Sequence, residues 1–292
     1  MPLTRLSIPG SALSRSVIAR SVATKQSMFA KKSAFLALVW VVGLLAAAAA
    51  APFFFAHGAE HMDFSKVLEA PSLEHLFGTD ALGRDLFYRV LTGARVSLSV
   101  GVVAVGLSLL AGVLIGACAG YYGGWCDRLL MALVDIMLCF PAFFLILAVI
   151  AVLGPNVWNI MVIIGLTSWM GTARLVRAEI LSLKEREFIL AARALGAPGP
   201  WIIFRHLVPN SMGPVIVNAI LGVSSAILIE TGLSFLGIGV QPPTPSWGNI
   251  LLDGKASLGV AWWLTFFPGI MIFLTVLSMN VLGERAGELI HR

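Results

Sequence analysis

SLKEREFILAARALGAPGPWIIFRHLVPN, residues 182–210, is a long polar interruption in an otherwise apolar sequence. Within it, Lys184 to Leu195 predicts a short amphipathic helix, because apolar side chains recur on one side at helical spacing. These apolar residues are Phe188, Ala191, Ala192 and Leu195. Charged residues occupy the other sides of the same helix.

This helix has a clear end in the sequence. Gly196 stands where a helix stops in the left-handed conformation, and Pro198-Gly199-Pro200 prevents its continuation. Pro200 then predicts the first turn of a second short helix, Trp201 to Leu207. Two short helices held at a fixed angle are typical of a docking element and not of a pore wall.

The composition indicates a polytopic membrane protein. Of the 292 residues, 58% are hydrophobic and only 12% are charged, and the mean hydropathy is +0.91. A soluble domain cannot hide so much apolar surface. We therefore expect no nucleic-acid partner in spite of the net charge of +5. The three cysteines have no framework spacing, and we interpret them as small buried side chains.

Six apolar runs are long enough to cross a bilayer, for which roughly 20 residues are needed. We expect an all-α fold with transmembrane helices at Ala34–Phe55, Val96–Tyr122, Leu129–Gly154, Val157–Ala173, Met212–Leu236 and Ser257–Gly283. Residues 1–33 are then a basic arm, 56–95 a polar loop and 284–292 a tail. Residues 96–283 form a five-helix core that includes the loop 183–210.

The distribution of lysine and arginine predicts the orientation. With the N-terminus inside, fifteen of the twenty Lys and Arg residues lie on the inner side and five on the outer side. This asymmetry predicts that both termini and the loop 183–210 are cytoplasmic, and that residues 56–95 lie outside.

Small residues, prolines and aromatic residues predict how the spans pack. Consecutive GxxxG pairs in the second span let helices approach closely; the glycines are Gly112, Gly116 and Gly120. Pro141 and Pro268 predict kinks in the third and sixth spans. Phe235 and Trp247 flank a turn-rich loop and are expected to anchor at the membrane interface.

Residues 75–98, HLFGTDALGRDLFYRVLTGARVSL, combine charged and apolar side chains before the second span. Asp85 and Arg89 are spaced to pair at i,i+4 on a helix. An apolar side of that helix is expected to lie on the membrane surface; its residues are Leu82, Leu86, Phe87 and Val90. Asp80, Arg84 and Asp85 are candidates for an outer gate or a binding-protein surface, with a structural plug as the equal alternative.

Two acids lie inside predicted spans, where ionisable residues are costly and usually face the bundle interior or a water-filled path. Asp135 and Glu230 are therefore candidates for a translocation path, with an interhelical hydrogen bond or salt bridge as the structural alternative. An intramembrane enzyme, the main alternative of another class, would use the same two acids. A proton-driven secondary transporter would usually show inverted repeats, and we find none in the sequence.

Three strings resemble those of ABC importer permeases. Leu190-Ala191-Ala192, Gly196 and Val208-Pro209 have the spacing of the cytoplasmic EAA loop of that family, although Leu190 replaces the usual Glu and His206 the usual Ile. GTDALGRDLFYR, residues 78–89, is similar to a signature of the dipeptide, oligopeptide and nickel subfamily, with Tyr88 at a place usually taken by Ser. ETGLSFLGIGVQPPTPSWG, residues 230–248, is similar to a second signature of that subfamily.

The resemblance implies a type I ABC importer permease fold in the bacterial cytoplasmic membrane. It implies a homologous second permease subunit in the lipid bilayer, two cytoplasmic ATPase subunits and an extracytoplasmic solute-binding protein as partners. This chain has no GxxxxGK[ST] phosphate loop. We therefore expect it to be no enzyme and to bind no cofactor or metal, while the ATPase subunits bind ATP and Mg. The implied cargo is a di- or oligopeptide, with nickel or a nickel chelate as the alternative.

The resemblance also gives the loop 183–210 a role, that of a coupling helix that docks in a groove of the ATPase subunit. The residues expected in this coupling loop are Leu190, Ala191, Ala192, Arg193, Ala194, Leu195, Gly196, Ala197 and Pro209. Because Leu190 replaces the usual Glu, Glu187 is a candidate to supply the missing polar contact from one turn earlier. Neither an intramembrane enzyme nor a proton-driven secondary transporter explains the spacing from Ala191 to Pro209.

Overall fold

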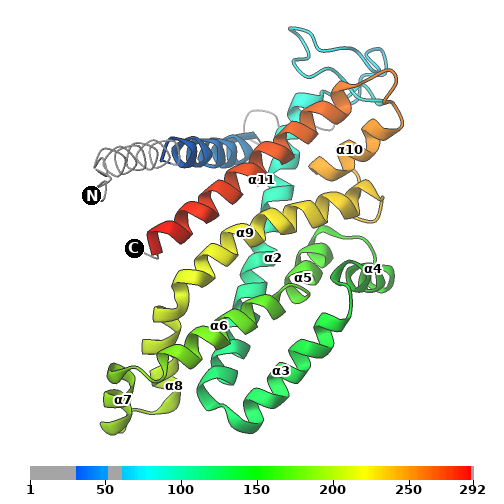
Figure 1. Ribbon diagram of the computed structural model, residues 1–292. Coiled ribbons are helices and arrows are strands. Elements are labelled where there is room, and N and C mark those ends of the chain that lie inside the picture. The colour runs from blue at the N-terminus through cyan, green and yellow to red at the C-terminus, as the bar shows by residue number, and fades with distance from the viewer. Residues whose placement is uncertain (1–30, 52–60, 291–292) are drawn as a thin grey trace, which may run out of the picture.

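The computed structural model describes residues 31–51 and 61–290, and most of these residues are helical. Long helices run between one end of the molecule, which carries α7, and the opposite end, which carries α10 (Figure 1). We call these the α7 end and the α10 end. The helices are Lys31–Ala51, α2 Leu86–Tyr122, α3 Gly124–Cys139, α4 Ala142–Leu153, α5 Val157–Leu166, α6 Trp169–Leu183, α7 Glu187–Ala194, α8 Gly199–Ile202, η1 Ile203–Leu207, α9 Val208–Phe235, α10 Trp247–Lys255 and α11 Trp263–Ile290.

Within the described residues, five helical segments are long and apolar enough to cross a membrane, and α3 with α4 makes a sixth if this bent pair counts as one span. Such a count agrees with the six predicted spans. The prediction of one kinked helix over 129–154 is wrong, because α3 and α4 meet at 83°. Pro141 explains the break, since it disfavours the helical conformation for Phe140, whose backbone is extended (φ −89°, ψ 126°).

Several span boundaries differ from the prediction for local reasons. α2 begins ten residues before the predicted Val96, because the Asp85 side chain caps its first turn through the amide of Phe87 (2.8 Å). The predicted end at Ala173 is wrong as well, since α6 continues to Leu183 after a break between α5 and α6. α11 includes most of the predicted tail and ends at Ile290.

The second short helix predicted at 201–207 is not a separate element. α8, the π-helical segment η1 and α9 follow one another without a gap and form one helical run of 37 residues, Gly199–Phe235. Pro200 does lie in the first turn of that run, as predicted. The long span therefore begins immediately after the turn that follows α7.

α2 is the helix against which much of the bundle packs. A Cβ atom on Gly112 would lie 2.6 Å from the Cβ of Thr172, and one on Gly116 would lie 2.4 Å from the carbonyl oxygen of Ala173. Only glycine leaves room for α6 at this distance, so the predicted close approach at the GxxxG pairs is confirmed. α2 and α6 thus form one tightly packed unit.

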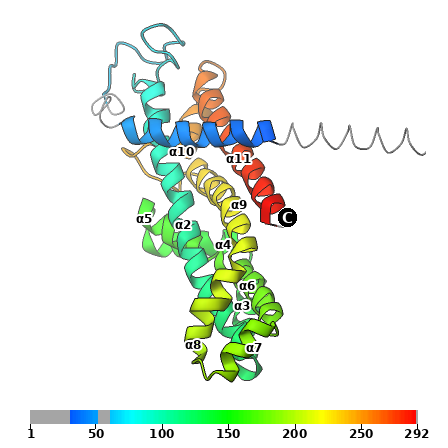
Figure 2. The same cartoon turned by 90° about the vertical axis from the view of Figure 1, so that its left-hand side faces the viewer.

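The helix Lys31–Ala51 crosses α2 and α11 (Figure 2). The indole of Trp40 donates a hydrogen bond to the hydroxyl of Thr275 on α11 (3.3 Å). Leu44 and Ala48 are buried in the same cluster as side chains of α2 and α11. The basic arm up to residue 30 and the predicted continuation of this span over 52–55 lie outside the described residues.

α10 lies in the segment that sequence analysis interpreted as a turn-rich loop. The hydroxyl of Ser246 accepts a hydrogen bond from the amide of Asn249 (3.2 Å), and the Asn249 side chain accepts one from the amide of Ser246 (2.9 Å). This capping box starts the helix. Trp247 does not lie at a membrane interface as predicted, because it is fully buried and its indole donates to the carbonyl of Val90 on α2 (3.1 Å).

Candidate functional site

The segment α7 and its C-terminal turn are built by local hydrogen bonds. Gly196 adopts the left-handed conformation with φ +80°. Its amide donates to the carbonyl of Arg193 (2.9 Å), and the amide of Ala197 donates to the carbonyl of Ala192 (3.1 Å). These two bonds are the Schellman motif. They confirm the predicted stop at Gly196 and fix the direction in which the chain leaves α7.

α7 is held to the bundle by a side chain that sequence analysis did not single out. Ile189 is fully buried and packs in a cluster with Ile180 of α6 and Leu207 of η1. Phe188 and Leu195, by contrast, are 43% and 88% exposed. The predicted apolar side of α7 therefore faces largely outward, away from the bundle.

Exposed apolar side chains gather at the α7 end. They are Phe188, Leu190 and Leu195 from α7, Trp201 from α8 and Phe204 from η1, and we call these five residues the α7 surface. The same stretch of sequence also contains three exposed charged residues, Glu187, Arg193 and Arg205. An exposed apolar patch with a polar rim is typical of a surface that binds another protein.

Tyr121, near the end of α2, connects α7 to α8. The guanidinium of Arg193 lies over its ring, 5.1 Å from the centroid. A Cβ atom on Gly199 would lie 3.0 Å from the ring carbon Cε1, so α8 reaches Tyr121 this closely because residue 199 is glycine. Sequence analysis missed Tyr121, since only the fold brings α2 beside the 183–210 segment.

The helix that leads into α7 is anchored by charged contacts. Arg177 on α6 forms two hydrogen bonds with the carboxylate of Asp127 on α3, at 2.5 and 2.6 Å. Lys184, directly after α6, donates to the carbonyl of Gly120 on α2 (3.4 Å). A displacement of α7 would therefore act on α2 and α3 as well as on α6.

Buried charges cluster at the α10 end. The carboxylate of Asp80 accepts hydrogen bonds from Arg84 (2.7 Å) and Arg89 (2.5 Å), and Arg89 also reaches Asp253 of α10 (3.0 Å). Asp80 and both arginines are almost completely buried. The cluster ties residues 80–89 to α10, which fits the structural-plug interpretation of Asp80 and Arg84.

The predicted Asp85–Arg89 pair is wrong. Asp85 is the residue before α2, and its carboxylate folds over the first turn and also contacts the ring nitrogen Nδ1 of His75 (2.7 Å). The apolar side expected on the membrane surface is wrong too, because Leu86 and Val90 are fully buried beside α10 and α11. Both errors arise because α10 packs on the start of α2.

Exposed charges shape the loop that precedes this cluster. A hydrogen bond between Lys66 and Glu74 holds the pKa of Glu74 below its usual range and raises that of Lys66. Hydrogen bonds from the hydroxyl and amide of Ser65 lower the pKa of Asp63. These groups are charged at neutral pH and hold residues 63–74 in a compact turn.

Glu230 lies in a buried network that joins three segments. Its carboxylate accepts hydrogen bonds from the hydroxyls of Ser97 on α2 (3.0 Å) and Ser234 on α9 (2.7 Å). These hydroxyls in turn accept hydrogen bonds from the amides of Trp247 (3.3 Å) and Val240 (3.0 Å). The carboxylate is fully buried. These contacts match the interhelical hydrogen bond that was the alternative to a role of Glu230 in a translocation path.

Asp135 has a different environment. It forms a salt bridge with Arg174 on α6, and more than half of each side chain is exposed. Among the described residues, Asp135 and Glu230 share no hydrogen-bond partner. An active site that uses both acids would bring them to one substrate, and these separate contacts do not support it.

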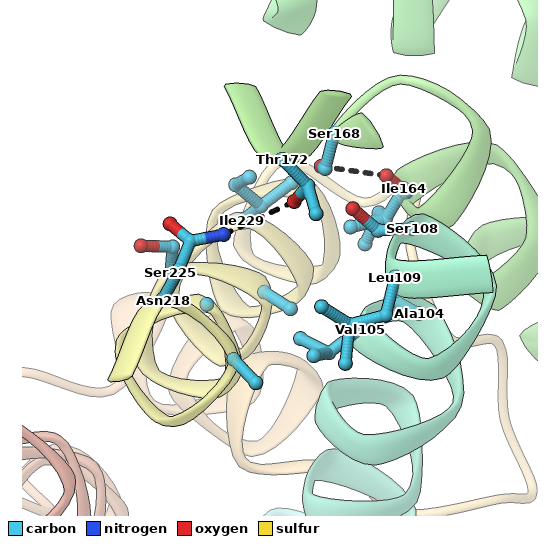
Figure 3. Close-up of a pocket in the computed structure, with 13 residues that line it drawn as sticks. Ala104, Val105, Ser108, Leu109, Ile164, Ser168, Thr172, Asn218, Ser225 and Ile229 are labelled. Carbon is cyan, nitrogen blue, oxygen red and sulfur yellow. Dashed lines mark hydrogen bonds between the residues drawn. The ribbon is translucent and has the colours of Figure 1, made fainter. Parts of the chain in front are cut away.

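A polar cavity lies between α2, the α5–α6 segment and α9 (Figure 3). It has a volume of about 190 Å³ and is lined by uncharged residues. Its polar side chains are Ser108, Ser168, Thr172, Asn218 and Ser225. The side-chain amide of Asn218 donates a hydrogen bond to the hydroxyl of Thr172 (3.0 Å). This hydrogen bond connects α9 to α6 across the cavity. Sequence analysis missed this site, although Asn218 inside an apolar span was a usable signal.

Comparison with known families gives a match over more than half of the chain. Residues 112–292 match the family described as binding-protein-dependent transport system inner membrane component. The matched part contains α7, Glu230 and the α6 and α9 walls of the cavity, whereas Ser97 and the cavity residues of α2 precede it.

Similar proteins are transport permeases. The chain is 43% identical over 253 residues to the dipeptide transport system permease protein DppC of Alkalihalophilus pseudofirmus, covering 87% of this chain and 83% of that protein. It is 40% identical over 262 residues to the oligopeptide transport system permease protein OppC of Haemophilus influenzae, covering 89% and 84%. It is 41% identical over 252 residues to the glutathione transport system permease protein GsiD of Escherichia coli, covering 86% and 83%.

Solved structures show the same fold. The MetNI methionine ABC transporter in an inward-facing conformation contains a chain that matches with a TM-score of 0.55 at 17% identity. The match covers 71% of this chain and 98% of that one. Taken with the sequence relatives, this fold shows that the chain is a multi-pass membrane transport protein and belongs to the family of binding-protein-dependent transport system inner membrane components.

Proposed function

We propose that this chain is the permease subunit of an ATP-driven importer that carries di- or oligopeptides across the bacterial cytoplasmic membrane. The relatives described above are named as permeases for dipeptides, oligopeptides and glutathione. These names favour a peptide cargo over nickel or a nickel chelate.

The α7 surface is the observation that carries the proposal. A transport subunit without a phosphate loop needs a partner that hydrolyses ATP. Five exposed apolar side chains at one end of the bundle offer that partner a docking site. In this proposal, Leu190 to Ala197, Glu187 and Pro209 form the coupling segment, two ATPase subunits supply ATP and Mg, and the α7 end and both termini are cytoplasmic.

Rigid attachment makes α7 suitable for transmitting force. When the ATPase subunits close on ATP, α7 would move with them as one body. Its Schellman turn and the buried Ile189 resist bending between α7 and the bundle. The motion would then pass to α6 and α9, the two helices that the coupling segment joins, and through the Arg177–Asp127 pair to α3.

Further partners complete the importer in this proposal. A homologous second permease subunit would form the other half of the path within the bilayer. An extracytoplasmic solute-binding protein would deliver the cargo to the α10 end, which faces outward when the α7 end is cytoplasmic. The buried Asp80–Arg89 cluster would keep that end rigid during delivery.

Crosslinking tests the docking site. Cys118, Cys126 and Cys139 are first replaced by serine, and Ala194→Cys is then introduced into the chain expressed with its ATPase subunits. We expect a crosslink to the ATPase whose yield changes with nucleotide, whereas Ser257→Cys near the α10 end gives none. If cysteines at all positions from 191 to 197 give no crosslink in correctly inserted protein, the proposal is overturned.

Transport assays test the cargo. The complete importer is reconstituted into liposomes, and ATP-dependent uptake of a radiolabelled dipeptide, a tripeptide and nickel is compared. We expect uptake of the peptides and none of nickel. Uptake of nickel alone would replace the peptide assignment and leave the permease assignment intact.

A further inference from the structure

The cavity between α2, α6 and α9 has a chemistry suited to the backbone of a peptide. We propose that this cavity is a transient binding site for the peptide bonds of cargo during translocation. The proposal rests on the proposed function and adds to it a location and a mode of recognition. It assigns the contact to uncharged hydrogen-bonding groups, of which Asn218 and Ser108 are the principal ones.

Two polar groups in the cavity have unused hydrogen-bonding capacity. Asn218 donates through its amide nitrogen to Thr172 (3.0 Å), and among the described residues its carbonyl oxygen receives no hydrogen bond. The hydroxyl of Ser108 makes no hydrogen bond within the described residues and lies toward the cavity in Figure 3. A carbonyl oxygen and a hydroxyl can together serve one N–H donor and one C=O acceptor.

A peptide backbone presents this pair of groups at each non-proline residue. Contacts to the backbone do not depend on the side chains of the cargo, so one site can serve peptides of different sequence. The absence of charge in the lining fits this use, since a charged wall would hold some side chains and repel others. Weak and repeated binding is also what a pathway needs, because cargo must leave as readily as it enters.

Small residues keep the site open. Ala104, Ala219, Gly222 and Ala226 contribute to the wall, and a Cβ atom on Gly222 would lie 3.2 Å from Val105 across the cavity. Apolar Leu109, Ile164 and Ile229 line the remainder. The volume of about 190 Å³ accommodates a short part of a peptide and not a whole oligopeptide. The cargo would therefore pass the site one segment at a time.

The cavity is also connected to the coupling segment. Thr172 lies on α6 and Asn218 on α9, and these are the helices joined by residues 184–207. A movement of α7 that shifts α6 relative to α9 would stretch or break the 3.0 Å bond between these residues. The same movement would free both side chains for cargo or withdraw them from it.

Uptake kinetics test the proposal in the complete reconstituted importer. Asn218→Leu removes the polar groups at nearly constant size. We expect uptake at saturating binding protein to fall about tenfold, the equivalent of one lost hydrogen bond of about 1.4 kcal/mol. ATP hydrolysis stimulated by the loaded binding protein should fall by less than uptake does, since part of its loss comes from the broken Asn218–Thr172 bond between α9 and α6. Ser224→Ala is the control, since Ser224 is a buried serine of α9 that does not line the cavity.

Each outcome has one interpretation. Normal uptake by Asn218→Leu would overturn the binding site, and equal loss of uptake and stimulated ATP hydrolysis would show a defect of coupling or folding and overturn it as well. If the wild-type importer itself takes up no peptide, the proposed function fails instead.

Thiol modification gives a second measurement that does not depend on losing function. Ser108→Cys is made in the chain that lacks the three native cysteines, with Ser99→Cys on the same helix as the control. During turnover, we expect excess peptide to slow modification at position 108 severalfold and to leave position 99 unchanged. Equal rates at position 108 with and without peptide would contradict the proposal.

Discussion

The guanidinium of Arg193 on α7 lies over the ring of Tyr121 on α2, 5.1 Å from its centroid. Arg193 belongs to the segment that we propose docks the ATPase, and Tyr121 lies near the end of α2, the helix against which α6 packs. Gly199 of α8 meets the same ring from its own side of the turn. Tyr121 therefore stands between both short helices and gives the docking segment a second attachment besides Ile189.

Replacing Tyr121 should weaken the coupling of ATP hydrolysis to uptake. Tyr121→Ala removes the cation–π contact, worth roughly 0.5–1 kcal/mol at an exposed site, and opens a gap beside Gly199. We expect peptide uptake per ATP hydrolysed to fall severalfold in proteoliposomes. Tyr121→Phe retains the ring and should behave like wild type. The idea is wrong if the alanine variant keeps the wild-type ratio.

Packing between α2 and α6 should be sensitive to a single methyl group. In Gly116→Ala, the new Cβ would lie 2.4 Å from the carbonyl oxygen of Ala173, so we expect a loss of roughly 1–3 kcal/mol of stability. Gly106→Ala is a matched control on the same helix, because no atom lies within 4 Å of its Cβ. Thermal unfolding in detergent should show a lower midpoint for the first variant only. Similar midpoints would mean that the two helices do not pack this closely.

Features that depend on neighbours in the sequence could be predicted. Gly196 ends α7 because a residue without a side chain adopts the left-handed conformation easily, and Pro200 lies in the first turn of α8 because its fixed φ suits that place. The glycines of α2 predicted a close approach, which α6 makes. The family resemblance carried by the segment 190–209 was confirmed by the comparisons.

Features that depend on distant residues could not be predicted. Arg89 binds Asp80 and Asp253 in place of Asp85, because α10 brings Asp253 beside the start of α2. The capping box of Ser246 and Asn249 starts α10 in a stretch whose prolines and glycines favoured a loop. The polar cavity combines residues from three helices, and no single stretch of sequence contains it.

Removing the buried charge of Asp80 should destabilise the α10 end. Asp80→Asn leaves the guanidinium groups of Arg84 and Arg89 buried with only Asp253 to balance them. Breaking such a buried pair costs about 3–5 kcal/mol. Asp253→Asn is the control, since this side chain is 36% exposed and its removal should cost about 1 kcal/mol or less. Equal shifts of the thermal midpoint in the two variants would contradict this difference.

The charge of Glu187 should matter for coupling if it replaces the missing glutamate at position 190. Glu187 is exposed in the first turn of α7, where a negative charge also favours the helix by about 0.3–1 kcal/mol. This amount is too small to unfold the segment, so a defect in Glu187→Lys would report on docking. We expect a severalfold loss of ATP-driven peptide uptake, and normal uptake in Glu185→Lys, which changes a neighbouring exposed charge. Unchanged uptake in Glu187→Lys would exclude the role of Glu187.

Substitution of Glu230 distinguishes the proposed ATP-driven importer from an intramembrane enzyme and from a proton-driven transporter. Both alternatives would need the carboxyl group of this residue. In Glu230→Gln, the side chain can still hydrogen-bond the hydroxyls of Ser97 and Ser234, because each hydroxyl can donate or accept. We therefore expect ATP-driven uptake to stay within about threefold of wild type, while Glu230→Ala lowers the thermal midpoint by leaving buried hydroxyls without a partner.

An enzyme or a proton-driven carrier that depends on this carboxylate would instead lose all activity in Glu230→Gln, since an amide does not titrate. A stable, correctly inserted Glu230→Gln protein without any uptake would return Glu230 to the translocation path. Retained uptake with a stable fold would assign it to the network that holds α2, α9 and the start of α10 together.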